Sequence, residues 1–257
     1  MAGPLQISRE REGRLLVLRL ARPKANIVDA EMIGALDAAL AAAEAPGAPG
    51  LRGVLLTHEG PHFSFGASVQ EHLPAGFAAM LRSLHGLVLR LAGFPLPVLV
   101  SIQGQCLGGG LEVAAAGHML FAAPDAKLGQ PEMQLGVFAP AASCLLPERM
   151  GQAAADDLLL SGRSIDGREA HRLGLVQVVA EDPEAAALAW FDEHLSKKSA
   201  SSLRLAVQAA RHDLVARLRA KVAAVEALYG ERLMATHDAL EGLNAFLEKR
   251  APRWEDR

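Results

Sequence analysis

The chain has only two cysteines, and this scarcity argues against a disulfide-rich or a metal-binding protein. Cys106 and Cys144 stand far apart in the 257 residues and lack the spacing of metal ligands. Small secreted domains depend on several disulfides, which two distant cysteines do not supply. We therefore expect two small buried residues in a reducing compartment, and no bound metal.

The sequence also lacks the signals of membrane insertion and of secretion. No uncharged apolar run reaches the ~18 residues that a membrane span requires. The first twelve residues, MAGPLQISRERE, contain no apolar stretch of the kind found in a signal peptide. The formal net charge of −3 gives no reason to expect nucleic acid or an anionic membrane as a partner. We expect a soluble cytoplasmic protein.

Two common nucleotide-binding motifs are missing from the most glycine-rich stretch. Residues 104–116 read GQCLGGGLEVAAA, and neither a P-loop nor G-x-G-x-x-G matches them. Instead, a strand-like segment leads into three glycines and then into helix formers. The first turn of a helix has N–H groups without intrahelical partners, and glycine lets a ligand approach them closely. The pattern predicts a site for an anion or a developing oxyanion, although such glycine runs are more often only tight turns.

Short apolar strands alternate with amphipathic helices through most of the chain. The expected strands cover residues 5–9, 14–20, 53–57, 98–103, 119–122 and 175–179. The expected helices cover residues 30–45, 76–91, 141–150 and 153–161, one more follows the glycines and runs to about 117, and another begins at 164. Residues 58–73 and 127–136 are expected to be loops. This alternation predicts crossover units around a β-rich core. After residue 182 only helical patterns remain, and these must pack on the core or on another subunit.

Three of these segments, in this order and at this spacing, resemble the crotonase, or enoyl-CoA hydratase/isomerase, superfamily. They are FSFGASVQ at residues 63–70, GQCLGGGLE at 104–112 and GQPEMQLG at 129–136. The resemblance covers nearly the whole chain. It implies an α/β fold, a spiral of ββα units, with the CoA site and active site in a core of residues 1–195. It also implies that residues 196–257 form a helical oligomerisation region, which packs in trimers that often pair as hexamers.

The resemblance implies a hydro-lyase that acts on an acyl-CoA thioester. Its oxyanion hole would consist of the backbone N–H groups of Ala67 and Gly109. The family has an aspartate where this chain has Ser68, a change that should spare the hole because the donor is backbone. Glu112 and Glu132 stand where hydratases of the family keep an acid/base pair.

Two carboxylates suit the addition of water, because one proton leaves water and another arrives on carbon. Taken alone, Glu132 could simply favour a helix N-terminus, and Glu112 could be an exposed helix position. A carboxylate buried among glycine, valine and alanine for no purpose would cost several kcal/mol, however. We assign the activation of water to Glu132, with Glu112 orienting the water or sharing the proton transfer.

Residues 24–29, 63–68 and 136–143 resemble one subfamily, the cyclohexa-1,5-diene-1-carbonyl-CoA hydratases of anaerobic aromatic (benzoyl-CoA) degradation. In that reaction hydroxide adds at the carbon β to the thioester, and the proton lands at the far end of the conjugated diene. Phe65, Phe138 and Pro140 are predicted to line the acyl pocket, although Phe138 could equally belong to the core. A general 2-enoyl-CoA hydratase or isomerase, and a non-catalytic scaffold of the same fold, remain as alternatives.

The resemblance also places CoA, which enters only as part of the substrate, so that no separate cofactor is expected. The residues implied in CoA binding are Lys24, Ala25, Ile27, Ala67, Ser68, Val69, Gln70 and Lys249. Lys249, or its neighbour Arg250, would meet the CoA phosphates from the tail of a neighbouring subunit. The expected partners are therefore an acyl-CoA thioester and further copies of this chain.

Overall fold

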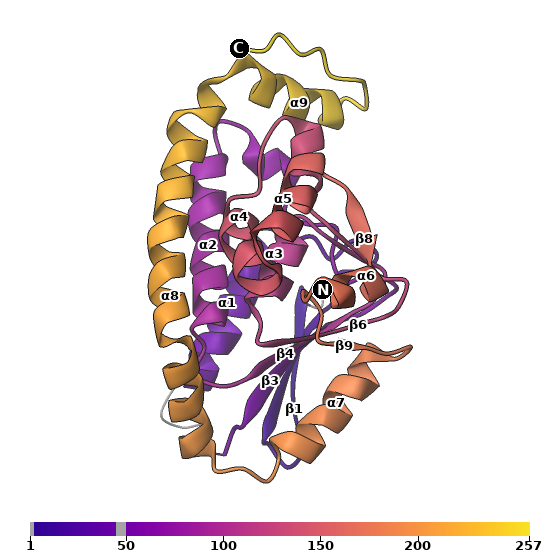
Figure 1. Cartoon of the computed structure of the whole chain (residues 1–257), viewed down its shortest axis with the longest axis vertical. Coiled ribbons are helices and arrows are strands. Elements are labelled where there is room, and N and C mark those ends of the chain that lie inside the picture. Colours follow the sequence, from indigo (N-terminus) through magenta and orange to yellow (C-terminus); the bar gives the residue numbers. More distant parts are fainter. Residues whose placement is uncertain (1–2, 45–49) are drawn as a thin grey trace.

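The computed structural model describes residues 3–44 and 50–257. A six-stranded sheet with the order β1-β2-β3-β4-β6-β9 forms its centre (Figure 1). These strands are β1 (Leu5–Glu10), β2 (Leu15–Leu20), β3 (Gly53–His58), β4 (Val98–Ile102), β6 (Met119–Ala122) and β9 (Val178–Val179). β1 and β2 form an antiparallel hairpin, and every later pair is parallel. Parallel neighbours require crossover connections, which the helices supply.

Both faces of the central sheet are covered, which explains why its strands are almost continuously apolar. The covering helices are α1 (Ala30–Glu44), α2 (Phe77–Ala92) and α3 (Gly109–Ala116) on one face and α7 (Pro183–His194) on the other. Successive residues of β2 serve opposite faces, as the pleat requires. Leu16 and Leu18 join the core under α1, α2 and α3, whereas Leu15 and Val17 pack with Phe191 of α7.

A second sheet of three short strands was not predicted from the sequence, and its last strand occupies residues 164–166, where a helix was expected to begin. It has the order β5-β7-β8, with β5 (Gln105–Leu107), β7 (Lys127–Gly129) and β8 (Ser164–Asp166). The prediction of a loop over residues 127–136 was wrong, because β7 and the 3₁₀ helix η2 (Pro131–Leu135) occupy this range. Three-residue strands contain too few residues to show an alternating pattern. β9 is also shorter than the predicted strand at 175–179.

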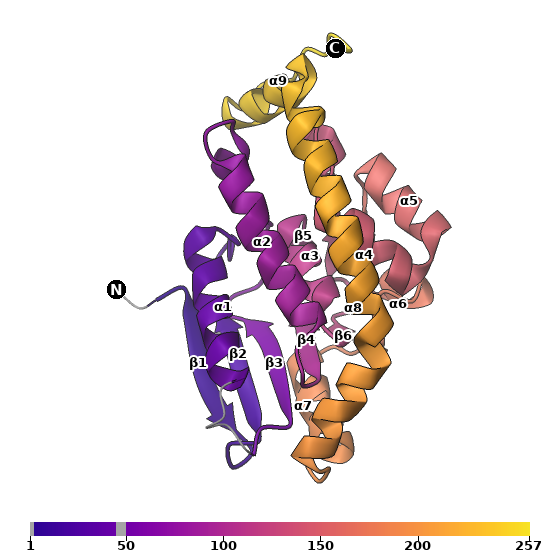
Figure 2. The same cartoon turned by 90° about the vertical axis from the view of Figure 1, so that its left-hand side faces the viewer.

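The C-terminal helices pack along the core, as Figure 2 shows for α8 beside α2. The remaining elements are η1 (Val69–His72), α4 (Pro140–Met150), α5 (Gln152–Ser161), α6 (Gly167–Arg172), α8 (Ala200–Glu231), η3 (Leu233–Ala235) and α9 (His237–Leu247). Leu218, Val222 and Tyr229 are the buried residues of α8. The predicted boundary after residue 195 falls in the link between α7 and α8. No helix in the described part of the chain is long and apolar enough to cross a membrane.

Candidate active site

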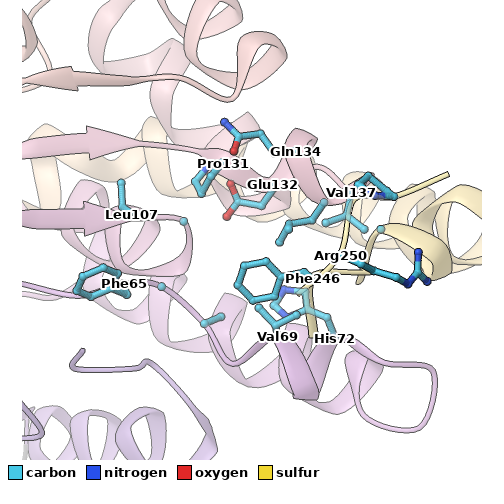
Figure 3. A pocket seen from close by; sticks show the side chains of 16 residues that line it. Phe65, Val69, His72, Leu107, Pro131, Glu132, Gln134, Val137, Phe246 and Arg250 are labelled. Atoms are coloured by element: carbon cyan, nitrogen blue, oxygen red, sulfur yellow. The ribbon is translucent and has the colours of Figure 1, made fainter. Parts of the chain in front are cut away.

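A cavity of about 370 Å³ lies between three parts of the chain that are distant in sequence. Its lining comes from residues 65–72, from residues 107–108 and 131–137, and from α9 with the tail that follows it. Glu132 reaches into this space, with Leu107 to one side and Phe246 facing it (Figure 3). The lining is mostly apolar, and its charged side chains are those of Glu132 and Arg250. This composition suits a ligand that has an apolar group.

The pairing of β5 with β7 brings the two predicted carboxylates into one site. Leu107 pairs with Gly129 at the ends of these parallel strands, and the Gly108 amide donates to the Gly129 carbonyl at 3.0 Å. Each strand then leads directly into a helix. Glu112 lies in the first turn of α3, and Glu132 lies in η2. The register of β5 against β7 therefore sets the separation of the two acids.

The backbone segments that carry Ala67 and Gly109 are in direct contact. A Cβ atom built on Gly109 would lie 3.1 Å from the Ala67 nitrogen and 3.0 Å from the Ala67 Cβ, so no larger residue fits there without movement. Gly109 is the first residue of α3, where no intrahelical acceptor exists for its amide. Among the described residues, neither amide donates to a backbone carbonyl of a loop or turn. Two unused donors thus lie side by side, as an oxyanion hole requires.

Glu112 is a buried carboxylate with partial compensation. Glu112 is 3% exposed, and its Oε1 atom accepts a hydrogen bond from the Ala142 amide at 2.8 Å. Burial raises the pKa of Glu112 above its ordinary value. A positive charge on His85 and the amides of Ala142 and Ala141 act in the opposite direction and favour the ionised form.

Glu132 has less compensation for its burial. Removal of water, followed by the negative charge of Glu112, raises the pKa of Glu132 to about 8. Gln130, which is 1% exposed, lies against this carboxyl and donates to its Oε2 atom at 2.9 Å when the amide nitrogen faces it. The loss of water and the negative charge of Glu112 thus both favour the protonated form of Glu132. Two carboxyls whose environments separate their pKa values form a general acid and a general base.

Asn26 fixes the loop that runs beside the cavity, and we did not foresee this role. Its buried amide nitrogen donates to the carbonyls of Glu59 and His62, and its oxygen accepts from the Arg22 amide. As a result, the segment after residue 24 runs next to the segment that carries Ala67. The Phe65 amide donates to the Ala25 carbonyl at 2.9 Å in this arrangement. A buried asparagine cannot be recognised from sequence alone.

The structure brings together some of the predicted site residues and not others. Phe65, Ala67, Val69 and Glu132 line the cavity, while Gly109 and Glu112 are not in its lining and belong to α3, which follows the lining residue Gly108. Among the predicted residues outside the cavity lining are Lys24, Ala25, Ile27, Ser68, Gln70, Phe138, Pro140 and Lys249.

Phe138 packs its ring on Tyr229, with 5.3 Å between centroids, and Pro140 is buried at the start of α4. The alternative reading of Phe138 as part of the core describes this packing better. The adjacent residue Val137 lines the cavity instead, because one step along the backbone turns the side chain to a different side.

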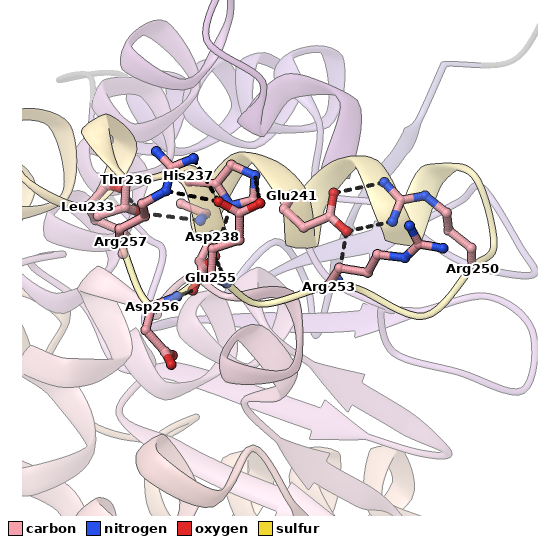
Figure 4. A network of polar contacts seen from close by, with 11 residues as sticks. Leu233, Thr236, His237, Asp238, Glu241, Arg250, Arg253, Glu255, Asp256 and Arg257 are labelled. Carbon is pink, nitrogen blue, oxygen red and sulfur yellow. Dashed lines mark hydrogen bonds and ion pairs between the residues drawn. The ribbon is translucent and has the colours of Figure 1, made fainter.

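The tail of the chain closes one end of the cavity. Arg250, which lines the cavity, is held by the Glu241 carboxylate at 2.5 and 2.8 Å. Asp238 accepts from the amides of Glu255 and Asp256 at 2.8 Å each. Figure 4 shows how these contacts fold the tail back along α9. The folded tail keeps Phe246, Arg250 and Pro252 at the cavity, so Arg250 rather than Lys249 reaches it.

The described residues were also examined for side chains that could together bind a metal ion. Among residues 3–44 and 50–257, no group of three or more His, Cys, Asp or Glu side chains is arranged to hold a metal ion. Both cysteines are free and buried. Burial raises the pKa of Cys144 to about 11, so this thiol stays neutral.

The raised pKa of Glu132 predicts an unusual dependence of stability on pH. An unfolded glutamate loses its proton near pH ~4.3, whereas folded Glu132 keeps it to about pH 8. The stability that this proton contributes is present below the unfolded pKa and is lost as pH rises through the folded pKa. The Glu132→Gln variant has no such proton to lose. We expect its melting temperature to exceed that of the wild type increasingly from pH 5 to 8, and by a constant amount above.

Thermal unfolding across this pH range tests the prediction. Glu148→Gln is a suitable control, because the Glu148 carboxylate is held by Arg217 and Lys221 at 2.9 Å each. The melting temperature of that variant should not rise above that of the wild type at high pH. If the difference in melting temperature between wild type and Glu132→Gln is the same at all pH values, Glu132 does not keep the proton that is assigned to it.

The chain is similar to known proteins along its whole length. Residues 10–257 match the model of the enoyl-CoA hydratase/isomerase family. The chain is 68% identical over 256 residues to the cyclohexa-1,5-dienecarbonyl-CoA hydratase of Thauera aromatica, covering 100% of this chain and 98% of that protein. It is 35% identical to a probable enoyl-CoA hydratase of Bacillus subtilis, with 93% and 94% of the two chains covered. Among solved structures, an enoyl-CoA hydratase from Mycobacterium avium matches with a TM-score of 0.85 and 26% identity, covering 99% of this chain and 100% of that one.

Proposed function

Because the chain belongs to the enoyl-CoA hydratase/isomerase family, we propose that it is a hydro-lyase that adds water to cyclohexa-1,5-diene-1-carbonyl-CoA. The product is 6-hydroxycyclohex-1-ene-1-carbonyl-CoA, and the reaction serves the anaerobic degradation of aromatic compounds through benzoyl-CoA. The observation that carries this proposal is the 68% identity to the Thauera enzyme over the entire chain. The paired glutamates beside two unused backbone amides support hydration as the chemistry.

The first step is the attack of water on the ring carbon β to the thioester. Glu112, whose ionised form accepts hydrogen bonds from the amides of Ala142 and Ala141, takes a proton from water as the new carbon–oxygen bond forms. The electron pair of the attacked double bond moves onto the thioester oxygen, which becomes an enolate. The amides of Ala67 and Gly109 donate to this oxygen, and each such donor typically contributes ~10²–10³ in rate.

The second step returns the electrons to carbon. The enolate pair shifts through the second ring double bond to the ring carbon opposite the hydroxylated one, where Glu132 delivers its proton. A double bond conjugated with the thioester remains in the ring. Return of the proton from Glu112 to Glu132 resets the pair. This division reverses the sequence-based prediction, in which Glu132 activates the water, because the pKa of about 8 keeps the proton on Glu132.

CoA binding is proposed for the loop beside the cavity and for the tail. Lys24, Ala25 and Ile27 lie on the segment that runs alongside residues 65–67, while Ser68, Val69 and Gln70 lead into η1. Lys249 is exposed and is proposed to meet the CoA phosphates. Replacing Lys24 or Lys249 with alanine should raise KM for the CoA thioester and leave KM for a pantetheine thioester unchanged. An equal change in both would argue against phosphate contact.

We also propose a cytoplasmic homotrimer or dimer of trimers that needs no cofactor beyond the CoA of its substrate. Hydration changes no net oxidation state, so it requires no redox group. Leu205, Leu228 and Phe246 of the C-terminal helices are large apolar residues with more than a third of their surface exposed. A neighbouring subunit would cover such side chains. The mass in solution, measured by light scattering, separates a trimer from a hexamer, and a monomer would contradict both.

Spectrophotometric assays with two substrates test the proposed reaction. We expect hydration of cyclohexa-1,5-diene-1-carbonyl-CoA with a kcat/KM well above that for crotonyl-CoA. In D2O, one deuterium should appear in the product at ring carbon 3, opposite the carbon that bears the hydroxyl group. Activity on crotonyl-CoA alone would remove the cyclic substrate and favour a general enoyl-CoA hydratase. If neither thioester is hydrated, the proposed hydratase function is wrong.

A further inference from the structure

Two arginines from different helices meet at the C-terminal end of α3. Arg149 of α4 and Arg211 of α8 both donate to the Gly117 carbonyl, the second at 2.9 Å. Their other acceptors are the carbonyls of Ala92, Ala115 and Ala116, which end α2 and α3. Because the two guanidinium groups share one acceptor atom, their positive charges lie close together.

These two charges lack a carboxylate partner. Within residues 3–44 and 50–257, every hydrogen bond of the two side chains goes to a backbone carbonyl. The C-terminal ends of α2 and α3 each contribute about half a negative charge, which offsets roughly one of the two positive charges. Burial, together with the charge of Arg211, lowers the pKa of Arg149 to about 9. About one positive charge is therefore left without a counterion in the described part of the chain.

A cavity of about 240 Å³ lies against both guanidinium groups. Each group has five N–H donors, and together the two groups use five of them on the backbone carbonyls. The other donors are available to a ligand. The carboxylate in the lining is that of Glu148, which is already bound by Arg217 and Lys221 at 2.9 Å each. The cavity is thus positively charged, and it is smaller than the roughly 300–1,000 Å³ of pockets for drug-sized ligands.

The residue after the shared carbonyl has a further unused donor. The Nδ1 atom of His118 accepts from the Val98 amide at 3.1 Å, so the ring proton lies on Nε2. This Nε2 atom is buried and has no hydrogen-bond partner among the residues that the structure describes. Buried polar groups are nearly always paired. The end of α3 is therefore rich in donors and poor in acceptors.

The shape of the guanidinium group favours an oxyanion as the missing partner. Its planar fork binds two oxygens of a phosphate or carboxylate at once. Two such forks at one carbonyl suit an anion with several oxygens. A free phosphate or sulfate ion meets this requirement and is small enough for the cavity.

We propose that this cavity, which we call the arginine site, binds one free phosphate or sulfate ion between Arg149 of α4 and Arg211 of α8. The anion supplies the missing negative charge and ties both helices to the end of α3. The arginine site shares no lining residue with the cavity that contains Glu132. The inference is therefore independent of the proposed hydration reaction.

Calorimetric titration of the full chain with inorganic phosphate, at an ionic strength fixed with chloride, measures this binding. We expect one phosphate per chain. At ten times its Kd, phosphate should raise the melting temperature by about 3–5 °C, because it binds only the folded chain. Arg211→Gln should weaken the binding at least about tenfold, since charged hydrogen bonds are lost. Arg204→Gln is the control, because it removes an arginine of α8 outside the cavity lining and should bind phosphate as the wild type does.

A carboxylate built into the cavity gives a second test that keeps both arginines. Leu214 of α8 lines the cavity, so Leu214→Glu places an anion against the two guanidinium groups. This variant should fold and show no response of its melting temperature to phosphate. Leu160→Glu introduces the same charge on α5 at a residue that is 72% exposed, and it should keep the wild-type response. If Leu214→Glu does not fold, Arg211→Gln decides the question.

The proposal is overturned if the wild type binds no phosphate, or if Arg211→Gln binds it as tightly as the wild type. A carboxylate from a second copy of the chain is the competing occupant. In that case phosphate would not bind, and Arg211→Gln would lower the mass in solution measured by light scattering, which also overturns the proposal. Absence of hydratase activity would refute the proposed function without changing the outcome of this titration.

Discussion

Replacing either Glu112 or Glu132 with glutamine lowers kcat for hydration of the cyclic dienoyl-CoA by about 10²–10⁴-fold, with little change in KM. Each carboxyl moves a proton that glutamine cannot move, while the amide keeps the size of the side chain. Initial rates at saturating substrate measure the effect. Glu148→Gln, in which a carboxylate outside the cavity is lost, should retain the wild-type rate. Near wild-type hydration by Glu132→Gln with every acyl-CoA tested would remove this residue from the mechanism.

The two variants should differ in one further reaction, which reports the division of roles. Glu132, as the group that protonates carbon, also removes that proton from the product. Wild type and Glu112→Gln should therefore exchange hydrogen for deuterium at ring carbon 3 of the product in D2O at pH 8–9. Glu132→Gln should lose this exchange together with hydration. The opposite outcome, with exchange lost only in Glu112→Gln, would restore the prediction made from sequence.

Much of the fold could be predicted because its strands and helices carry strong periodic signals. The apolar run of β2 faces two cores, and the amphipathic pattern of α2 faces one, so both stand out in the sequence. The residues that combine into the site were harder to connect. Glu112 and Glu132 could be identified by resemblance, but their proximity depends on β5 and β7, which are three residues long. Such short strands are stable only within the finished structure.

The residues that escaped prediction share one property, which is that their roles depend on tertiary packing. Gln130 is adjacent to Pro131 in the sequence, yet its contact with Glu132 depends on the turn into η2. His85 resembles any polar residue on an amphipathic helix until α8 brings Glu226 to it. Phe138 is an aromatic residue in the right segment, but its ring packs in a T-shaped contact with Tyr229 of α8. Sequence patterns describe which face of a helix is buried, and they do not identify the partner.

Replacing Gly109 with alanine tests the oxyanion hole itself, and we expect kcat to fall by about 10²–10³-fold, the value of one lost donor. The new Cβ would lie 3.0 Å from the Ala67 Cβ and 3.1 Å from the Ala67 nitrogen, so the two segments must separate by a few tenths of an ångström. Both amides would then leave the position of the enolate oxygen. The substrate thioester is neutral before attack, so KM should change far less than kcat.

The melting temperature of Gly109→Ala distinguishes the loss of the oxyanion hole from damage to the fold. Alanine is a better helix former than glycine by about 0.5–1 kcal/mol, which offsets part of the strain at the start of α3. Gly34→Ala is the matched control, because Gly34 lies within α1 and a Cβ there meets no atom within 4 Å. We expect Gly34→Ala to raise the melting temperature and keep full activity. If Gly109→Ala hydrates substrate at the wild-type rate, backbone donation from these two segments does not stabilise the enolate, since a shift of this size at both donors cannot leave an oxyanion hole intact.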